Sequence, residues 1–426
     1  MPPSRNASLA PLPSIDPLNK GIGLFDQPLA HEEVASLGWN LLNEDICLPA
    51  AVLYEDKLRH NIDWMRRFIR AYGVNLAPHG KTTMAPRLFE MQIEAGAWGI
   101  TVATAHQALV AYRHGVRRVL LANQLVGRQN MTLIAQLLRD PGFTFYCLVD
   151  SAEQIDPLGA FFAGQGLCLN VLFELGVTGG RSGLRNDEQM RSALEALARW
   201  SLSLALCGVE LYEGVLSEEG AIRAFLQRAV ETARTLAAEG RFRRSPFLLS
   251  GAGSAWYDVV AEVFAGADFG KDAEIVLRPG CYLTHDVGAY RLAQERILAA
   301  NPVARQVGGN LVTALHIWAH VQSRPEPRRA IVGLGRRDAA FDSGLPVPAL
   351  HYRPGQKEPL PPPAHWKLAK IMDQHAYLDL AADDDLHIGD MIAFDIAHPC
   401  LTFDKWRILP LLDSEYRVVD LIQTFF

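Results

Sequence analysis

A lysine in a short loop is the first residue in this sequence that could do chemistry. Lys81 lies in the segment APHGKT at 77–82, directly after a short apolar run at 75–77. If that run is a strand of a parallel βα barrel, Lys81 stands at the strand's C-terminal end, where such barrels form their active sites. A partly buried amine there suits Schiff-base chemistry. Most loop lysines are plain surface charges, so the other segments must decide between the two interpretations.

Two glycine-containing segments could bind an anion. The segment SGAGSA at 250–255 follows an apolar run, and its small residues would let backbone N–H groups approach a phosphate at a helix start. The segment RPGCY at 278–282 follows the next apolar run and would place its tyrosine beside the same phosphate. Each segment could also be a tight connection. The candidate phosphate ligands are Ser250, Gly251, Gly253, Ser254 and Tyr282.

His398 and Cys400 are the candidate metal ligands. In an extended chain, side chains two residues apart point the same way, so these two could bind one ion. Nitrogen and sulfur ligands together fit Zn²⁺. His375 precedes a strand-like run and could add a third polar group. A loop histidine beside a buried cysteine is the alternative interpretation of the pair.

A regular alternation of short apolar runs and amphipathic segments predicts the elements that position these residues. Such alternation indicates parallel βαβ units, and eight of them in ~200–250 residues match a closed (β/α)8 barrel. An open doubly wound sheet is the competing topology, but its usual GxGxxG after the first strand is absent from the sequence. The eight runs are 75–77, 99–102, 119–122, 143–149, 167–173, 204–211, 247–249 and 275–277.

The pattern changes after about residue 300. Short strand-like runs follow one another around a proline-rich loop at 346–363, and no helical segment of any length is predicted there. We therefore predict an α/β protein in which a (β/α)8 barrel at 46–295 precedes a β-rich domain at 296–426. We expect the N-terminal segment 1–45 to pack with the β-rich domain.

Composition is that of an ordinary globular chain. The 426 residues are 49% hydrophobic and 21% charged, with a net charge of −6 and without lysine or arginine runs, so we expect neither nucleic acid nor a membrane as partner. No stretch reaches the ~20 apolar residues of a membrane span, and the first 20 residues lack the apolar core of a secretory signal. Six cysteines lie far apart without a CxxC motif. We expect a cytoplasmic protein with reduced thiols.

The segment PHGKT at 78–82 resembles the PH-x-KT sequence around the cofactor lysine of the D-serine dehydratase and D-threonine aldolase family, which has an alanine-racemase-like fold. Further segments are similar to family motifs in the same order along almost the whole chain. These are ELG at 174–176 with GRSG at 180–183, YEG at 212–214, SGAGS at 250–254, RPGCY at 278–282 and HPC at 398–400.

The resemblance implies pyridoxal 5′-phosphate (PLP) on Lys81, Zn²⁺ on His398 and Cys400, and a homodimer with each site built at the subunit interface. It assigns His375 to orienting the substrate or the metal. The dehydratases of the family carry His-x-Cys, whereas the aldolases usually carry His-x-Asp, so Cys400 favours dehydration. Two departures from the family pattern, at 333–342 and 373–375, leave the substrate range open. The other residues that the resemblance places at the cofactor are His79, Arg181 and Tyr212.

We therefore expect a PLP-dependent, zinc-assisted dehydration of D-serine, or also D-threonine, to a 2-oxo acid and ammonia. Lys81, released by the incoming D-amino acid, would remove the α-proton before the β-hydroxyl leaves. A D-threonine aldolase would use the same parts to give glycine and an aldehyde. A PLP-binding protein without turnover is a third possibility. A racemase is the fourth and would need a second base, such as Tyr352 or Tyr377.

Overall fold

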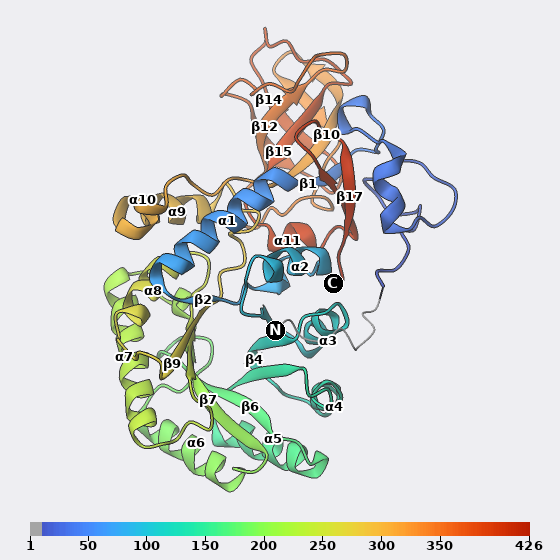
Figure 1. Ribbon diagram of the computed structural model, residues 1–426. Coiled ribbons are helices and arrows are strands. Elements are labelled where there is room, and N and C mark those ends of the chain that lie inside the picture. The colour runs from blue at the N-terminus through green and yellow to red at the C-terminus, as the bar shows by residue number, and fades with distance from the viewer. Residues whose placement is uncertain (1–10) are drawn as a thin grey trace.

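The computed structural model describes residues 11–426, which are arranged around two sheets. Figure 1 shows the barrel below and the β-rich domain above it, with the short helix α11 (Cys400–Phe403) at their junction. The predicted fold class is confirmed, because a parallel eight-strand TIM-like sheet is followed by a separate sheet-rich domain.

Eight parallel strands form the barrel sheet and coincide with the eight predicted runs. They pair in the order β2-β9-β8-β7-β6-β5-β4-β3. The sheet curls until its edge strands meet, where the Trp98 N–H donates to Leu76 O (2.7 Å) and the Thr101 N–H to Pro78 O (2.9 Å). The strands are β2 (Asn75–Leu76), β3 (Ile100–Val102), β4 (Arg118–Gln124), β5 (Thr144–Val149), β6 (Leu169–Leu175), β7 (Leu204–Leu211), β8 (Phe247–Gly251) and β9 (Ala273–Leu277).

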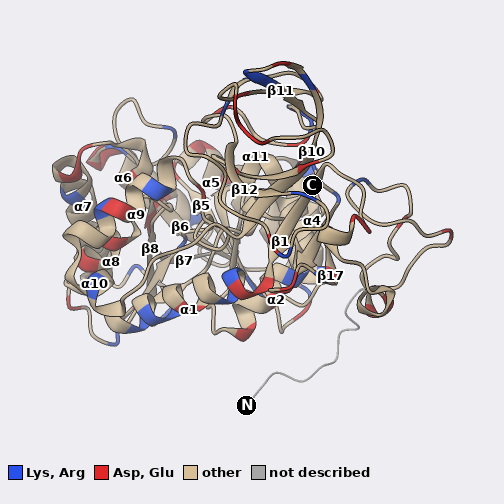
Figure 2. Ribbon diagram, turned by 90° about the horizontal axis from the view of Figure 1, so that it is seen from above, with Lys and Arg blue, Asp and Glu red and all other residues tan. Residues whose placement is uncertain are grey.

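Helices cover the outside of the barrel. Successive side chains of a strand alternate between faces, so Leu120 and Tyr146 fill the barrel interior while Leu121 and Cys147 pack outward under the helices. Figure 2 shows basic and acidic positions interspersed along the outer helices. The helices are α1 (Glu55–Tyr72), α2 (Pro86–Glu94), α3 (Ala105–Arg113), α4 (Arg128–Leu137), α5 (Ala152–Gln165), α6 (Asp187–Arg199), α7 (Glu219–Ala238), α8 (Tyr257–Ala265), α9 (Ala289–Ala300) and α10 (Pro302–Val307). Within residues 11–426, no helix is both long and apolar enough to cross a membrane.

The second sheet has nine strands. Its main path runs β13-β14-β11-β10-β1-β16-β17, and β15 joins β10 to β12. The strands are β1 (Ala50–Tyr54), β10 (Leu315–Glu326), β11 (Arg329–Val332), β12 (Val347–Tyr352), β13 (Lys367–Ile371), β14 (Ala376–Asp379), β15 (Met391–Asp395), β16 (Ile408–Leu412) and β17 (Val418–Gln423).

Strand β1 belongs to this second sheet, although the predicted barrel began at residue 46. All five of its residues are buried, and it pairs antiparallel with β10 and parallel with β16. The first barrel element is therefore α1. The N-terminal segment packs on the same domain over its described residues 11–45, where Val34, Trp39 and Leu41 share an apolar cluster with Trp318; residues 1–10 lie outside the described part of the chain. Its short 3-10 helices, η1 (His31–Leu37) and η2 (Leu41–Asn43), lie on the side of β17 in Figure 1.

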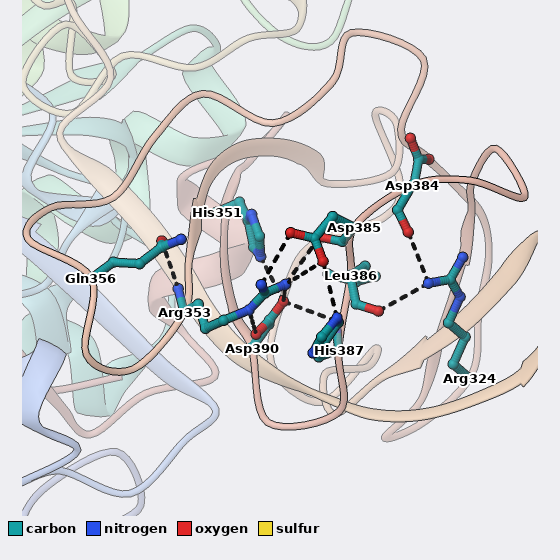
Figure 3. A network of polar contacts seen from close by, with 9 residues as sticks. All are labelled: Arg324, His351, Arg353, Gln356, Asp384, Asp385, Leu386, His387 and Asp390. Atoms are coloured by element: carbon teal, nitrogen blue, oxygen red, sulfur yellow. Dashed lines mark hydrogen bonds and ion pairs between the residues drawn. The ribbon is translucent and has the colours of Figure 1, made fainter.

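A polar network holds the loop between β14 and β15 (Figure 3). Arg353 donates to the carboxylates of Asp385 and Asp390, while Arg324 donates to the backbone oxygens of Asp384 (2.9 Å) and Leu386 (3.0 Å). Such bidentate guanidinium contacts fix a loop better than single hydrogen bonds do. The network ties this end of the β-rich domain together and contributes no residue to the cavity described next.

Candidate active site

A cavity of about 170 Å³ lies at the C-terminal ends of the barrel strands. It receives residues that follow β2, β3, β7, β8 and β9, together with Cys400 from α11 of the β-rich domain. The segments around Lys81 and Cys400, which lie far apart in the sequence, therefore meet at the face of the barrel where active sites form. The predicted residues that line it are His79, Lys81, Arg181, Tyr212, Gly253, Ser254 and Cys400.

Lys81 lies in the 3-10 turn η3 (Gly80–Thr82) and is exposed, so the partial burial expected from the sequence is not seen. The turn is held by close backbone packing. A Cβ on Gly280 would lie 2.8 Å from both the Cβ and the carbonyl oxygen of His79. Only glycine allows the loop after β9 to approach the lysine loop this closely.

The cavity is lined by three cations, Lys81, Arg181 and Arg278, and by no carboxylate among the described residues. Arg278 is buried and donates to Glu210, which lies behind the lining, and to the carbonyl oxygen of Leu211 (3.0 Å). Burial raises the pKa of Glu210 although Arg278 lowers it. Because the lining, within the described residues, has three cations and no carboxylate, it suits an anionic ligand. No role was assigned to Arg278 or to Glu210 from the sequence.

His79 is a neutral imidazole at the edge of the cavity. Burial lowers its pKa well below the usual value, and the nearby charges of Arg278, Lys81 and Arg181 lower it further. Its Nδ1 atom is buried without a hydrogen-bond partner. An unpartnered buried nitrogen is costly, which makes it a candidate contact for a ligand.

The glycine-rich loop after β8 is only partly free to bind phosphate. The N–H groups of Ala252 (3.1 Å) and Gly253 (2.7 Å) donate to the carboxylate of Glu213, a residue that sequence reasoning missed. Ser254 Oγ accepts hydrogen bonds from the N–H groups of Gly280 (3.1 Å) and Cys281 (3.0 Å). The glycine-rich loop is therefore hydrogen-bonded to the loops that follow β7 and β9.

Three predicted phosphate ligands do not line the cavity. Ser250 is buried within β8 and donates to Val276 O (3.0 Å). Gly251 faces α8, because a Cβ there would lie 3.2 Å from Phe264 and from Val260. Tyr282 is buried and accepts a hydrogen bond from Gln92 Nε2 (2.9 Å). Successive side chains along an extended backbone point in opposite directions, and these three residues point away from the cavity.

The candidate metal pair lies at the junction of the two domains. Cys400 begins α11, so the extended backbone assumed from the sequence is incorrect. The neighbouring Cys400 side chain, and the contact of His398 Nδ1 with Asp342 Oδ2 at 2.7 Å, raise the pKa of His398 to about 9. Cys400 Sγ lies 3.5 Å from Thr82 Oγ1 and 3.8 Å from Cys281 Sγ. The contact between the sulfurs lowers the pKa of Cys400 and raises that of Cys281.

His375 does not reach this cavity within one chain. It lies on the exposed turn between β13 and β14, where its carbonyl oxygen accepts from the Met372 N–H (2.7 Å). The tyrosines considered as second bases are also elsewhere. Tyr352 is buried and its OH donates to Gln356 O (3.3 Å), and the Tyr377 OH donates to Met372 Sδ (3.6 Å).

Two family models match the chain in succession. "Alanine racemase, N-terminal domain" matches residues 54–265, and "Putative serine dehydratase domain" matches residues 314–412. The chain therefore carries an alanine-racemase-like N-terminal domain followed by a serine-dehydratase-like domain, and its homologues include proteins named D-threonine aldolase and D-threo-3-hydroxyaspartate dehydratase. A D-threonine aldolase of Arthrobacter sp. is 24% identical over 72% of this chain and 76% of its own length. The D-threo-3-hydroxyaspartate dehydratase of Delftia sp. (strain HT23) is 33% identical over 33% of this chain and 36% of its own.

Solved structures share the fold. The D-threonine aldolase from Filomicrobium marinum has a TM-score of 0.73 at 24% identity, covering 91% of this chain and 97% of that one. Two mutants of a D-threo-3-hydroxyaspartate dehydratase have TM-scores of 0.71 and 0.70 at 23% identity, covering 92% and 91% of this chain and 97% and 99% of theirs. One replaces a histidine. The other, in a metal-free form, replaces a cysteine two positions later. The shared fold is a PLP-binding fold and the relatives are lyases, which supports an enzyme of that class.

Proposed function

We propose that this chain is a PLP-dependent lyase that dehydrates D-serine, or a related 3-hydroxy D-amino acid, to a 2-oxo acid and ammonia. One observation carries the proposal: Lys81 of the barrel and Cys400 of the β-rich domain line the same cavity. Thr82, next to the lysine, lies 3.5 Å from Cys400 Sγ. A base and a metal ligand would therefore act on neighbouring atoms of one substrate.

The residues of the cavity fit PLP. Three cations without a facing carboxylate suit its phosphate and the carboxylate of an amino acid, and the exposed amine of Lys81 can bind an aldehyde. At Gly253 a Cβ would lie 2.9 Å from the ring of Tyr212, so only glycine keeps this wall open. When bound, PLP supplies an electron sink for the charge left at the substrate Cα.

Each residue then has a role that its surroundings support. Lys81, once released by the substrate amine, takes the α-proton. Arg181 and Arg278 hold anionic groups, and His79, kept neutral by burial and by the cations around it, offers Nδ1 to the ligand without adding charge. His375 would act only from a partner subunit, so we propose a homodimer. The exposed side chains of Phe341, next to Asp342, and of Leu401, next to Cys400, favour an interface near the cavity.

We propose that His398 and Cys400 hold Zn²⁺. The donor chemistry fits, since an imidazole nitrogen and a thiolate are the ligands that zinc prefers. Asp342 on His398 Nδ1 is the carboxylate–histidine arrangement that orients the other ring nitrogen toward a metal. The histidine and cysteine replaced in the dehydratase mutants have the same two-residue spacing. Bound zinc would polarise the β-hydroxyl and make it a better leaving group.

The second candidate is an aldolase. It is favoured by the relatives that are named D-threonine aldolase and 3-hydroxy-D-aspartate aldolase and that match over 72% and 71% of this chain. The same residues would then remove the proton of the β-hydroxyl, and the Cα–Cβ bond would break. A racemase is not favoured, because Tyr352 and Tyr377, the tyrosines considered as its second base, do not line the cavity of one chain. All six cysteines are free, so we also propose a cytoplasmic location.

The test is product analysis with purified, PLP-loaded protein on D-serine and D-threonine. We expect ammonia and a 2-oxo acid, lost on chelation and restored by zinc. Glycine plus an aldehyde would instead establish the aldolase. Cys400→Ala should abolish zinc-dependent turnover, whereas the matched control Cys168→Ala, at an exposed cysteine outside the cavity, should not. Turnover that is unchanged by a chelator would contradict the role proposed for the metal. PLP binding without turnover of either substrate would contradict the proposal that the protein is an enzyme.

A further inference from the structure

We infer that Cys281 is a third protein ligand of the metal, so that the site is Cys281, His398 and Cys400 rather than a histidine–cysteine pair. The inference rests on the proposed function for the presence of a metal, and it goes beyond the pair to which the sequence pointed. Cys281 follows strand β9 of the barrel, and the pair belongs to the β-rich domain. The metal would therefore join the two domains directly.

The distance between the two sulfur atoms carries the inference. Cys281 Sγ and Cys400 Sγ are 3.8 Å apart. Two sulfur ligands that each lie ~2.3 Å from one tetrahedral zinc ion are separated by about 3.8 Å. A disulfide requires ~2.05 Å, so the two thiols are not bonded to each other. The separation is the one that a shared zinc ion needs, without any movement of the two sulfurs.

The surroundings of Cys281 hold it in this position. Its N–H donates to Ser254 Oγ (3.0 Å), and its carbonyl oxygen accepts from the His285 N–H (2.8 Å). Its side chain is buried yet lines the same cavity as Cys400. Other polar groups close to its sulfur are the hydroxyls of Thr82, at 4.0 Å, and of Tyr290. Neither is a preferred zinc ligand, so Cys400 is the natural partner for a shared soft ion.

His398, two residues before Cys400 in the β-rich domain, completes the set. As the side chains stand, Cys281 and His398 each contact Cys400 instead of facing a common point, and residues 11–426 contain no three such side chains already arranged around an ion. These contacts are hydrogen bonds between ligands, and a metal replaces them because thiol protons leave when it binds. His398 must shift toward the two sulfurs with its Nδ1 still on Asp342, while the sulfurs stay in place.

A site with these three ligands behaves differently from a pair. Two thiolates and one imidazole leave a single open position, the arrangement of Cys₂His catalytic zinc sites. The substrate would reach the ion through one oxygen only, and two thiolates would select zinc over Mg²⁺ or Mn²⁺. After chelation, added zinc should therefore restore the activity of the protein, whereas Mg²⁺ or Mn²⁺ should not.

The test counts sulfur ligands. X-ray absorption of the zinc-loaded, full-length protein should show two sulfur ligands per zinc, and one sulfur would overturn the inference without any variant. In the cobalt-substituted protein, Cys281→Ser should lower the thiolate-to-cobalt absorption by about half and weaken metal binding about tenfold or more. Cys281→Ala should behave in the same way if its serine counterpart does not fold. The control Cys168→Ser, at an exposed cysteine outside the cavity, should change neither quantity.

The outcomes separate this inference from the proposed function. If Cys400→Ser removes metal binding while Cys281→Ser leaves the absorption and the affinity unchanged, then His398 and Cys400 hold the metal without Cys281. That result would overturn the inference. If the wild-type protein binds neither cobalt nor zinc through sulfur, the metal part of the proposed function fails along with the third ligand. Two sulfurs that fall to one in each of the two variants would establish the three-ligand site.

Discussion

Replacing Arg278 with methionine should destabilise the protein strongly, and the size of the effect can be worked out from its surroundings. Its side chain is 4% exposed and that of its partner Glu210 is 1% exposed. The substitution leaves a buried carboxylate without its ion pair, a change that typically costs about 3–5 kcal/mol. Replacing Glu210 with leucine as well removes the stranded charge, so the double variant should lie within about 1–2 kcal/mol of the wild type.

The pH dependence gives a second check on the same pair. Burial already raises the pKa of Glu210, and loss of Arg278 raises it further. A carboxyl whose folded-state pKa is raised lowers stability above that pKa, and the loss shrinks as pH falls and the group takes up a proton. The single variant should therefore be most destabilised near pH 8 and less so near pH 6. The double variant should not show this difference.

The assay is urea unfolding without added PLP, followed by tryptophan fluorescence, for the wild type, both single variants and the double variant. Leaving out PLP matters because Arg278 also lines the cofactor cavity. Because each single substitution breaks the buried pair and the double does not leave a charge stranded, a coupling free energy of about 4 kcal/mol or more between the two substitutions is expected. Additive effects of the two substitutions, or an Arg278→Met variant within about 0.5 kcal/mol of the wild type, would refute the view that this ion pair supports the cavity.

Two further predictions concern the metal pair and the buried loop after β9. Asp342→Asn should weaken zinc binding about tenfold, the low end of the ~10–100-fold range for such partners, because Asp342 is 41% exposed. Competition with a zinc indicator measures this, and unchanged affinity would contradict the orienting role. Burial lowers the pKa of His285 from 6.5 to about 4, so stability should fall as pH falls through that window, by about 2 kcal/mol between pH 7 and 5. His285→Asn, which tolerates the φ of 52°, should reduce that fall in urea unfolding, and an unchanged pH slope would contradict it.

The sequence predicted the barrel well because each strand is a short, buried apolar run between amphipathic helices. The side-chain direction at the turns was harder to predict. The glycine-rich loop was located correctly, yet Ser250 and Tyr282 face away from the cavity, because one step along the backbone turns a side chain to the other face. His375 was proposed from its place before a strand-like run and from the family resemblance, neither of which predicts side-chain position, and it lies on an exposed turn.

Contacts between residues far apart in the sequence could not be predicted from the sequence alone. The sequence assigned Cys281 no role of its own and Cys400 the role of a metal ligand, and 119 residues separate them. Glu210 could have been suspected, since a carboxylate inside an otherwise apolar strand needs a buried partner. Arg278 was visible in the RPG segment, but its pairing with Glu210 depends on how β7 and β9 flank β8.

The place of β1 between β10 and β16 has a consequence for how the chain is made. A ribosome that adds about 5–20 residues per second completes Tyr54 roughly 13 to 50 s before it reaches Leu315, the first residue of β10. During that interval an apolar strand waits without either of its neighbours, while the whole barrel is synthesised and can fold. The β-rich domain is thus the last part to close, and a nascent chain that stalls within the barrel leaves this strand open to aggregation.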